Sequence, residues 1–366
     1  MERRPQISVS GSVLSLAGGG FGVSTDPSVS MAEFLTQAQH CLANMPVLIT
    51  GSGASAPYGI PTMPALATHI SETVTLTSPR GPEFLELLEN KGLEPALDVD
   101  ILDTSDVAQI VTITREHIEE ADLKAYFIQS NIEPDNGLSR CFRLLLNTTH
   151  TSVDVVTTNY DRIAEYCAEF AGYVATNTFN PGYVRRHRPD AESAVFLNGQ
   201  RVSEVRVWKV HGSVDWYRDH LGRSFGSPFY PTHDSVEPLI VIPGLKKYQE
   251  PFKQPFSTIF TGANEALREA RAFLTIGYGF NDFHIQAGFV DRAREERVPI
   301  VILAKELTDA AKRFIESLGD TPFCAIESCD GGSVIYSAKF PTGARIPGKE
   351  LWSLDGFLDA AFDGGV

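Results

Sequence analysis

The chain has 366 residues, of which 43% are hydrophobic and 21% are charged, and its formal net charge is −15. This composition is typical of a globular protein, and the length fits one large domain with an insertion, or two domains. Because neutralising nucleic-acid phosphates requires clustered Lys and Arg, the acidic balance argues against direct DNA binding as the main role.

Five cysteines are scattered along the chain, at Cys41, Cys141, Cys167, Cys324 and Cys329. None of them forms a C-x-x-C pair, so we predict no zinc ribbon and no bound metal. The sequence shows neither a secretory apolar segment nor a run of about 18 apolar residues that would span a membrane. We therefore expect a reduced, cytoplasmic protein without membrane contact.

Residues 1–45 are predicted to form an N-terminal arm followed by a lead-in helix at Ala32–Leu42. The first thirty residues are rich in Ser, Gly and Val. They fit either a mobile tail or an extended arm that pairs as a strand with a neighbouring subunit.

The stretch VLITGSGASAPYGIP, residues 47–61, is the first with a chemical signature. Its first four residues are predicted to be a buried parallel strand, and the glycines after it let the backbone turn tightly and approach a ligand. Gly51-x-Gly53-x-x-Ala56 fits the dinucleotide pattern G-x-G-x-x-A, and Glu72 follows about twenty residues later, as expected for a ribose contact. Backbone N–H groups at the start of the next helix would bind a phosphate. An ordinary tight turn explains the same residues.

Residues 62–150 are predicted to be a helical module inserted after this first βα unit. Helical periodicity recurs around Glu83–Glu89, Val107–Ile118 and Leu138–Leu146, with few strand signals between them. The stretch is too long to be a single crossover between two parallel strands.

Three more strand-like runs follow, and each ends in a polar cluster. They are Val153–Val156 before TTNYD, Val205–Val210 before HGSVDW, and Phe273–Ile276 before GYGFND. A helix is predicted at Arg162–Ala171 and an irregular lid at residues 219–255. Strands that alternate with helices imply a parallel sheet covered on both faces, in which ligands bind at the carboxyl ends of the strands. All the polar clusters are therefore expected on one rim of the sheet.

The remaining residues, 306–366, are predicted to be a C-terminal extension of helices and strands. After a strand at Pro299–Leu303, the pattern indicates a helix at Leu307–Leu318, two short strands within Phe323–Ser337, and a last helix near Leu354–Phe362. We therefore predict an α/β fold with a Rossmann-like parallel sheet, an inserted helical module and no zinc ribbon.

The polar clusters offer side chains for acid–base and hydrogen-bonding chemistry. His211, at a strand end beside a glycine, suits general-base work near neutral pH, although a lone histidine is often structural. Asn159 and Asp161 are candidates for the same site, and both can instead cap the helix that follows. Gly277 and Asn281 can present backbone and amide groups to a ribose or phosphate, or form a turn and a helix cap.

Together, GSGAS…GIP, TTNYD, KVHGSVDW and IGYGFND resemble the four signature blocks of the Sir2 (sirtuin-like) superfamily, in the family order. The resemblance implies a SIR2-like, NAD-binding domain at residues 46–305, with NAD⁺ as the substrate. It implies catalytic roles for Asn159, Asp161 and His211. It places the other candidates around NAD⁺: Gly51, Gly53, Ala54, Ser55, Ile60, Pro61, Thr158, Gly277, Tyr278 and Asn281.

Departures from the sirtuin deacylases narrow the expected activity. Those enzymes carry a four-cysteine zinc module after the catalytic histidine, whereas no cysteine lies between Cys167 and Cys324 here. Thr62–Met63 replaces their Phe-Arg, and Thr158 replaces their Gln. The pattern is similar to bacterial SIR2-like proteins of antiphage defence that hydrolyse NAD⁺, and the length fits a stand-alone subunit that partners a HerA-type ATPase.

The resemblance therefore implies an NAD⁺ glycohydrolase that releases nicotinamide and ADP-ribose, acts in antiphage defence by depleting NAD⁺, and assembles as a homo-oligomer. Three alternatives stay open. They are a sensor that binds NAD⁺ or ADP-ribose without turnover, a protein deacylase or ADP-ribosyltransferase on the same fold, and a Rossmann oxidoreductase. Nicotinamide release without hydride transfer would separate the hydrolase from the sensor and the oxidoreductase.

Overall fold

The computed structural model describes residues 27–99, 101–130, 137–189, 195–229, 236–242 and 253–362. The predicted arm at residues 1–26 lies outside these residues, as do residues 230–235 and 243–252 of the predicted lid. The lead-in helix is confirmed as α1 (Pro27–Ala43).

A nine-stranded sheet organises the molecule, in the order β15-β14-β13-β12-β11-β1-β2-β7-β3. The strands from β13 to β3 in this order are parallel, and β14 and β15 add an antiparallel edge. The four strands predicted to carry polar clusters are consecutive neighbours, β11, β1, β2 and β7. The expected α/β fold is therefore confirmed, and the polar clusters follow neighbouring strands at one rim of the sheet. The strand bounds are β1 (Val47–Thr50), β2 (Ser152–Thr157), β3 (Val174–Thr176), β7 (Glu204–Lys209), β11 (Phe273–Ile276), β12 (Ile300–Leu303), β13 (Phe323–Cys329), β14 (Gly332–Tyr336) and β15 (Ala344–Pro347).

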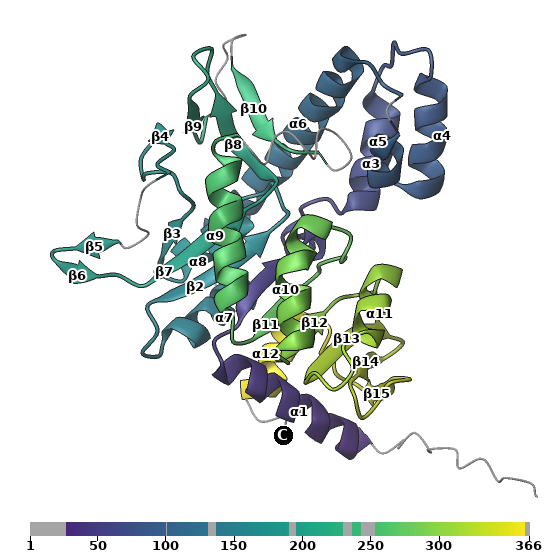
Figure 1. Cartoon of the computed structure of the whole chain (residues 1–366), viewed down its shortest axis with the longest axis vertical. Coiled ribbons are helices and arrows are strands. Elements are labelled where there is room, and N and C mark those ends of the chain that lie inside the picture. Colours follow the sequence, from purple (N-terminus) through teal and green to yellow (C-terminus); the bar gives the residue numbers. More distant parts are fainter. Residues whose placement is uncertain are drawn as a thin grey trace, which may run out of the picture.

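Helices cover both faces of this sheet, which gives three layers (Figure 1). The side-chain alternation of the strands explains the layering, since Leu48 packs into one core while Val47 and Ile49 pack into the other. The first core is shared with α1 and with α7 (Gly137–Leu146), α8 (Ile163–Phe170) and α12 (Leu354–Phe362). The second core is shared with α9 (Phe256–Glu269), α10 (Phe283–Glu295) and α11 (Asp309–Glu316).

The predicted helical stretch 62–150 contains two kinds of helix. Its first helices form a bundle beside the sheet, and the long helix α6 joins this bundle to the rest of the molecule (Figure 1). By contrast, α7 returns to the sheet and packs against α8, α12 and β2. The bundle helices follow the short α2 (Ser52–Ser55) and are α3 (Met63–Thr73), α4 (Gly81–Lys91), α5 (Leu93–Asp98) and α6 (Thr104–Ser130). We call α3 to α6 the helical module.

A second, antiparallel sheet has the order β10-β8-β9-β4, and sequence analysis did not predict it. Its strands are β4 (Arg185–Arg186), β8 (Gly212–Arg218), β9 (Ser224–Gly226) and β10 (Glu237–Ile240). The HGSVDW segment, interpreted as a loop-like cluster, begins strand β8, and part of the predicted irregular lid is β9 and β10. Six consecutive β8 residues are buried, including the polar Ser213 and Asp215 that alternate with Val214 and Trp216. A separate two-stranded ribbon is formed by β5 (Phe196–Leu197) and β6 (Gln200–Arg201).

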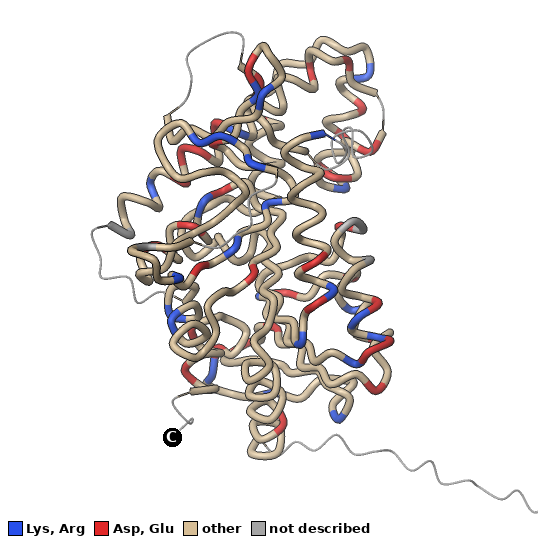
Figure 2. The backbone as a smooth tube through the Cα atoms, turned by 60° about the vertical axis from the view of Figure 1, so that its left-hand side comes forward, with Lys and Arg blue, Asp and Glu red and all other residues tan. Residues whose placement is uncertain are grey.

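The predicted C-terminal extension continues the main sheet through β13, β14 and β15. The two strands expected within Phe323–Ser337 are confirmed, whereas β15 was not expected. Basic and acidic residues are interspersed along the described chain (Figure 2). None of the described helices is long and apolar enough to cross a membrane.

Candidate active site

A cavity of about 1510 Å³ opens at the carboxyl ends of β1, β2, β7 and β11. It exceeds the usual size of small-molecule sites, roughly 300–1,000 Å³, so it has room for an extended ligand. The strand-end turns form one side of it, and α3, α4, α5, α10 and α11 form the others. Ten of the thirteen predicted site residues line it: Gly51, Ile60, Pro61, Thr158, Asn159, Asp161, His211, Gly277, Tyr278 and Asn281.

Bare backbone forms part of the cavity wall, where the turns after β1 and β11 meet. Gly53 N donates to Gly277 O at 3.2 Å. A Cβ added to Gly51 would lie 2.5 Å from Gly277 O, and one added to Gly277 would lie 2.4 Å from Gly53 Cα. Gly277 also has φ +55°, which side chains rarely adopt. Glycine is therefore required at these positions, because the two turns approach each other too closely for a side chain.

The other residues of the predicted dinucleotide pattern lie outside the cavity lining. Gly53 is exposed on the turn, whereas Ala54 and Ser55 are buried behind it. Glu72 is exposed near the end of α3 and is not placed for the predicted ribose contact. The spacing rule assumes that the second strand follows the first helix, but here the chain enters the helical module instead.

A hydrogen-bonded triad joins the glycine turn to the TTNYD loop. Asn159 Nδ2 donates to Gly51 O at 2.9 Å and to Ser55 Oγ at 3.0 Å. Ser55 Oγ in turn donates to Asp161 Oδ1 at 3.0 Å. Because both amide hydrogens of Asn159 are used, its side-chain oxygen is the group left to accept a hydrogen bond from a ligand.

Asp161 is buried at the point where the loop enters α8. Its Oδ1 also accepts from Ile163 N, at the first residue of α8, at 3.1 Å. The N-cap position itself is Arg162, so Asp161 is not the predicted helix cap. The fully buried Lys209 donates from Nζ to the Asp161 main-chain oxygen. Burial raises the pKa of the Asp161 carboxyl to about 6, against the opposing effect of the Lys209 charge.

His211 pairs with an acidic residue that sequence analysis did not assign to the site. His211 Nε2 lies 2.7 Å from Asp282 Oδ2, and both residues line the cavity. Asp282 Oδ1 accepts from Ile285 N at 3.3 Å, so one carboxylate caps α10 and holds the imidazole. With Nε2–H directed to Asp282, Nδ1 is the nitrogen that can accept a proton. The clue in the sequence was an acid immediately after GYGFN, at the same rim as His211.

The helical module adds a wall that sequence analysis did not assign. Glu94 of α5 lines the cavity, and its charge contributes to the raised pKa of Tyr160 and Tyr278, both raised chiefly by burial. The Asp282 charge acts on the same two tyrosines, so both carboxylates are near this part of the rim. The module also contributes apolar and acidic side chains: Leu85, Glu86, Leu88, Glu89, Leu93, Asp98 and Ile118.

The opposite wall is basic and aromatic. Arg294 of α10 and Arg313 of α11 line the cavity together with Phe314 and Phe280. Guanidinium groups of this kind suit phosphate or ribose oxygens. Among the described residues, no group of three or more His, Cys, Asp and Glu side chains is arranged to hold a metal ion.

Residues 153–322 match the family model of the SIR2-like domain. The matched residues include Asn159, Asp161, His211 and the turn after β11, so this part of the chain is similar to a SIR2-like domain. The glycine turn after β1 precedes the matched residues. No curated protein matches the chain.

Solved structures of Sir2 proteins resemble the chain at low sequence identity. One, from a study of the mechanism and regulation of Sir2 enzymes, is 15% identical, covers 80% of this chain and 94% of its own, and has a TM-score of 0.42. A second, a complex of a Sir2 homologue with NAD, is 14% identical, covers 80% of this chain and 87% of its own, and has a TM-score of 0.44. Since both scores are below 0.5, the assignment rests on the domain match.

Proposed function

We propose that the chain is an NAD⁺ glycohydrolase, which cleaves the nicotinamide–ribose bond and releases nicotinamide and ADP-ribose. One observation carries the proposal: Asn159, Asp161 and the His211–Asp282 pair meet at one cavity in the part of the chain that matches a SIR2-like domain. The size of the cavity and the two arginines in its lining, Arg294 and Arg313, support a substrate with a pyrophosphate.

The proposed reaction needs little from the protein beyond orientation and charge. When the bond from the ribose anomeric carbon to the nicotinamide nitrogen breaks, its electron pair neutralises the pyridinium ring, so the leaving group needs no proton. The ribose gains oxocarbenium character, as in glycoside hydrolysis. The carboxylates of Asp161 and Asp282 supply negative potential that stabilises this cation.

Water then completes the reaction in the proposed mechanism. Its oxygen forms the new bond to the anomeric carbon, and one proton leaves to His211 Nδ1, while Asp282 holds the other ring nitrogen. The free side-chain oxygen of Asn159 orients the water or a ribose hydroxyl. A sensor that binds without turnover is the second candidate, because the bonds of Asn159 and Asp161 also serve to join two loops.

We also propose a biological role, which rests on the sequence resemblance alone. In this proposal the chain is a cytoplasmic antiphage effector that depletes NAD⁺ and works as a homo-oligomer with a HerA-type ATPase. Measuring turnover with and without a HerA-type ATPase tests the partnership, since a gated enzyme is more active in the complex.

The test of the activity is nicotinamide release from NAD⁺ by the purified protein, beside His211→Ala. Loss of the base should lower kcat at least about 100-fold while NAD⁺ binding persists, since general-base groups contribute roughly 10²- to 10⁴-fold. His220→Ala is the matched control, because His220 is exposed and outside the cavity lining. A folded His211→Ala protein with the wild-type rate contradicts the assignment. Wild-type protein that binds NAD⁺ without releasing nicotinamide favours the sensor.

A further inference from the structure

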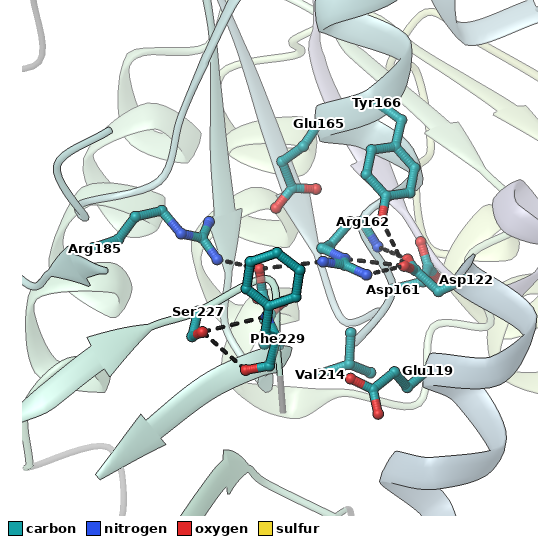
Figure 3. A network of polar contacts seen from close by, with 12 residues as sticks. Glu119, Asp122, Asp161, Arg162, Glu165, Tyr166, Arg185, Val214, Ser227 and Phe229 are labelled. Carbon is teal, nitrogen blue, oxygen red and sulfur yellow. Dashed lines mark hydrogen bonds and ion pairs between the residues drawn. The ribbon is translucent and has the colours of Figure 1, made fainter. Parts of the chain in front are cut away.

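A network of buried charges lies beside the TTNYD loop, and its members do not line the cavity (Figure 3). It begins at Asp122 of α6, whose side chain is 0% exposed. The Asp122 carboxylate accepts hydrogen bonds from Arg162 N at 2.6 Å, from Arg162 Nε at 2.9 Å and from Arg162 Nη2 at 2.6 Å. It accepts a fourth bond from the Tyr166 hydroxyl at 2.7 Å. The Asp122 carboxylate therefore binds the start of α8 through four hydrogen bonds.

The charges alternate along the network into the antiparallel sheet. Arg162 Nη1 lies 3.8 Å from Asp215 Oδ2 of β8, and Arg185 of β4 donates to the same carboxylate. Although burial opposes ionisation, Arg185 and Arg162 lower the pKa of Asp215. The Asp122–Arg162–Asp215–Arg185 network thus joins the helical module, the main α/β layers and the second sheet.

The network holds the main chain of the TTNYD loop next to Asp161. Arg162 directly follows Asp161, and the Arg162 backbone N–H bonded to Asp122 belongs to the peptide that links these two residues. On the other side, Lys209 Nζ donates to the carbonyl oxygen of that same peptide. Val214 N of β8 donates to Tyr160 O at 3.0 Å. The main chain around Asp161 is therefore held from α6, β7 and β8 at once.

Helix α6 connects these contacts around Asp161 to the cavity wall. Ile118 lines the cavity, and Asp122 lies one helical turn further along the same face. The 27 residues of α6 span about 40 Å at 1.5 Å per residue, so the helix reaches from α3 of the module to α8, β8 and β10. A shift of α6 would move both the module wall and the Asp161 peptide.

We propose that the Asp122–Arg162–Asp215–Arg185 network is a positioning network, in which Asp122 couples the placement of the helical module to the geometry of the Asn159–Asp161 loop. The proposal rests on the proposed NAD⁺ hydrolysis. These four residues act through the loop and not on the substrate. Weakening the network should therefore lower kcat more than it raises KM.

The variants separate positioning from simple stability. Asp122→Asn keeps the shape but removes the charge, whereas Asp122→Leu combined with Arg162→Met replaces the buried pair with apolar groups. Such replacements often restore stability, because no buried charge remains unpaired. Glu120→Gln is the matched control, since Glu120 is an exposed acid of α6 paired with Lys124. Arg185→Gln removes only the last charge of the network.

In NAD⁺ turnover, we expect Asp122→Asn to lower kcat at least tenfold with KM changed less than threefold. The double variant should melt near the wild-type temperature and still have low kcat, and Arg185→Gln should lower kcat about threefold. Glu120→Gln should match wild type. A double variant that folds and turns over at the wild-type rate overturns the proposal. If Asp122 variants fail to fold, unchanged kcat in Arg185→Gln overturns it.

Hydrogen exchange of the amides in residues 158–163 gives a readout that needs no activity. Exchange should be at least about tenfold faster in Asp122→Asn or Arg185→Gln than in Glu120→Gln. Equal exchange in these proteins overturns the proposal even if the wild type releases no nicotinamide. An inactive wild type with faster exchange in the variants instead counts against hydrolysis and supports the network.

Discussion

Among single residues, Asp161 has an environment that shifts the pKa of its carboxyl in two opposite directions. As an acceptor from Ile163 N and from Ser55 Oγ, its carboxylate is stabilised by hydrogen bonds. As a buried group it is separated from water, and burial outweighs these bonds and the Lys209 charge, so its pKa rises to about 6. A carboxylate that ionises near neutral pH at a cavity is typical of a functional site.

This pKa makes a prediction about stability. Because the folded pKa of about 6 lies above the ordinary 3.8, the protonated Asp161 favours folding below about pH 4. This contribution to the free energy of unfolding is lost as the pH rises to about 6. It amounts to about 3 kcal/mol, at 1.36 kcal/mol per pKa unit. Asp161→Asn should flatten this part of the stability profile, as measured by denaturant unfolding between pH 4 and pH 7.5. An identical slope in both proteins would contradict the pKa.

Some residues of the candidate site could be predicted from the sequence, and others could not. Asn159, Asp161 and His211 were predicted from the polar clusters that follow buried strands and from the resemblance of these clusters to the Sir2 blocks. The structure brings the three residues to one cavity. Asp282 and Glu94 were not assigned to the site. Asp282 belongs to the GYGFND cluster that the sequence placed at the same rim, but its pairing with His211 depends on a residue far away in the chain. The place of Glu94 at the cavity likewise depends on contacts that no local pattern records.

At the scale of elements, the site depends on how closely the turns after β1 and β11 approach each other. Their strands are hydrogen-bonded neighbours in parallel register, with Thr50 opposite Ile276. Gly51 N donates to Ile276 O at 3.2 Å, which continues the strand pairing into the turn. Elements of this kind were predictable, since short apolar runs that end in glycine recur along the sequence.

Gly277→Ala tests the need for this close approach. The new Cβ would lie 2.4 Å from Gly53 and the residue would keep φ +55°, so we expect the free energy of unfolding to fall by about 2–4 kcal/mol. NAD⁺ cleavage should fall with the distorted turn. Gly279→Ala is the control, because the nearest atom to its Cβ would be 3.4 Å away, and its stability should change by less than about 1 kcal/mol. Equal losses in both variants would contradict the role of the turn.

Other elements were missed for a physical reason. Strand β8 was missed although Ser213–Val214–Asp215–Trp216 alternates between polar and apolar residues, because the segment was assigned to the polar cluster that follows β7. Helix α7 looked like part of the module because its periodicity shows that it is amphipathic but does not reveal its partner. Only the packing of α7 on α8 and α12 separates it from α3 to α6.

At the scale of the whole molecule, the cavity is shared by structural units that meet around one loop. The parallel sheet provides the glycine turns and the polar residues, the helical module provides an acidic wall, and α10 and α11 provide arginines. The charge network ties the module and the antiparallel sheet to the start of α8 (Figure 3). Sequence analysis predicted the α/β architecture, but not this arrangement, since charged pairs between distant segments have no sequence signature.

The most direct test of NAD⁺ hydrolysis is the full product balance after incubation of the purified protein with NAD⁺, measured by chromatography with mass detection. We predict equal amounts of nicotinamide and linear ADP-ribose, together accounting for the NAD⁺ consumed, because water reaches the anomeric carbon in the proposed site. NAD⁺ that is bound but unchanged would contradict hydrolysis, as would nicotinamide released without matching free ADP-ribose.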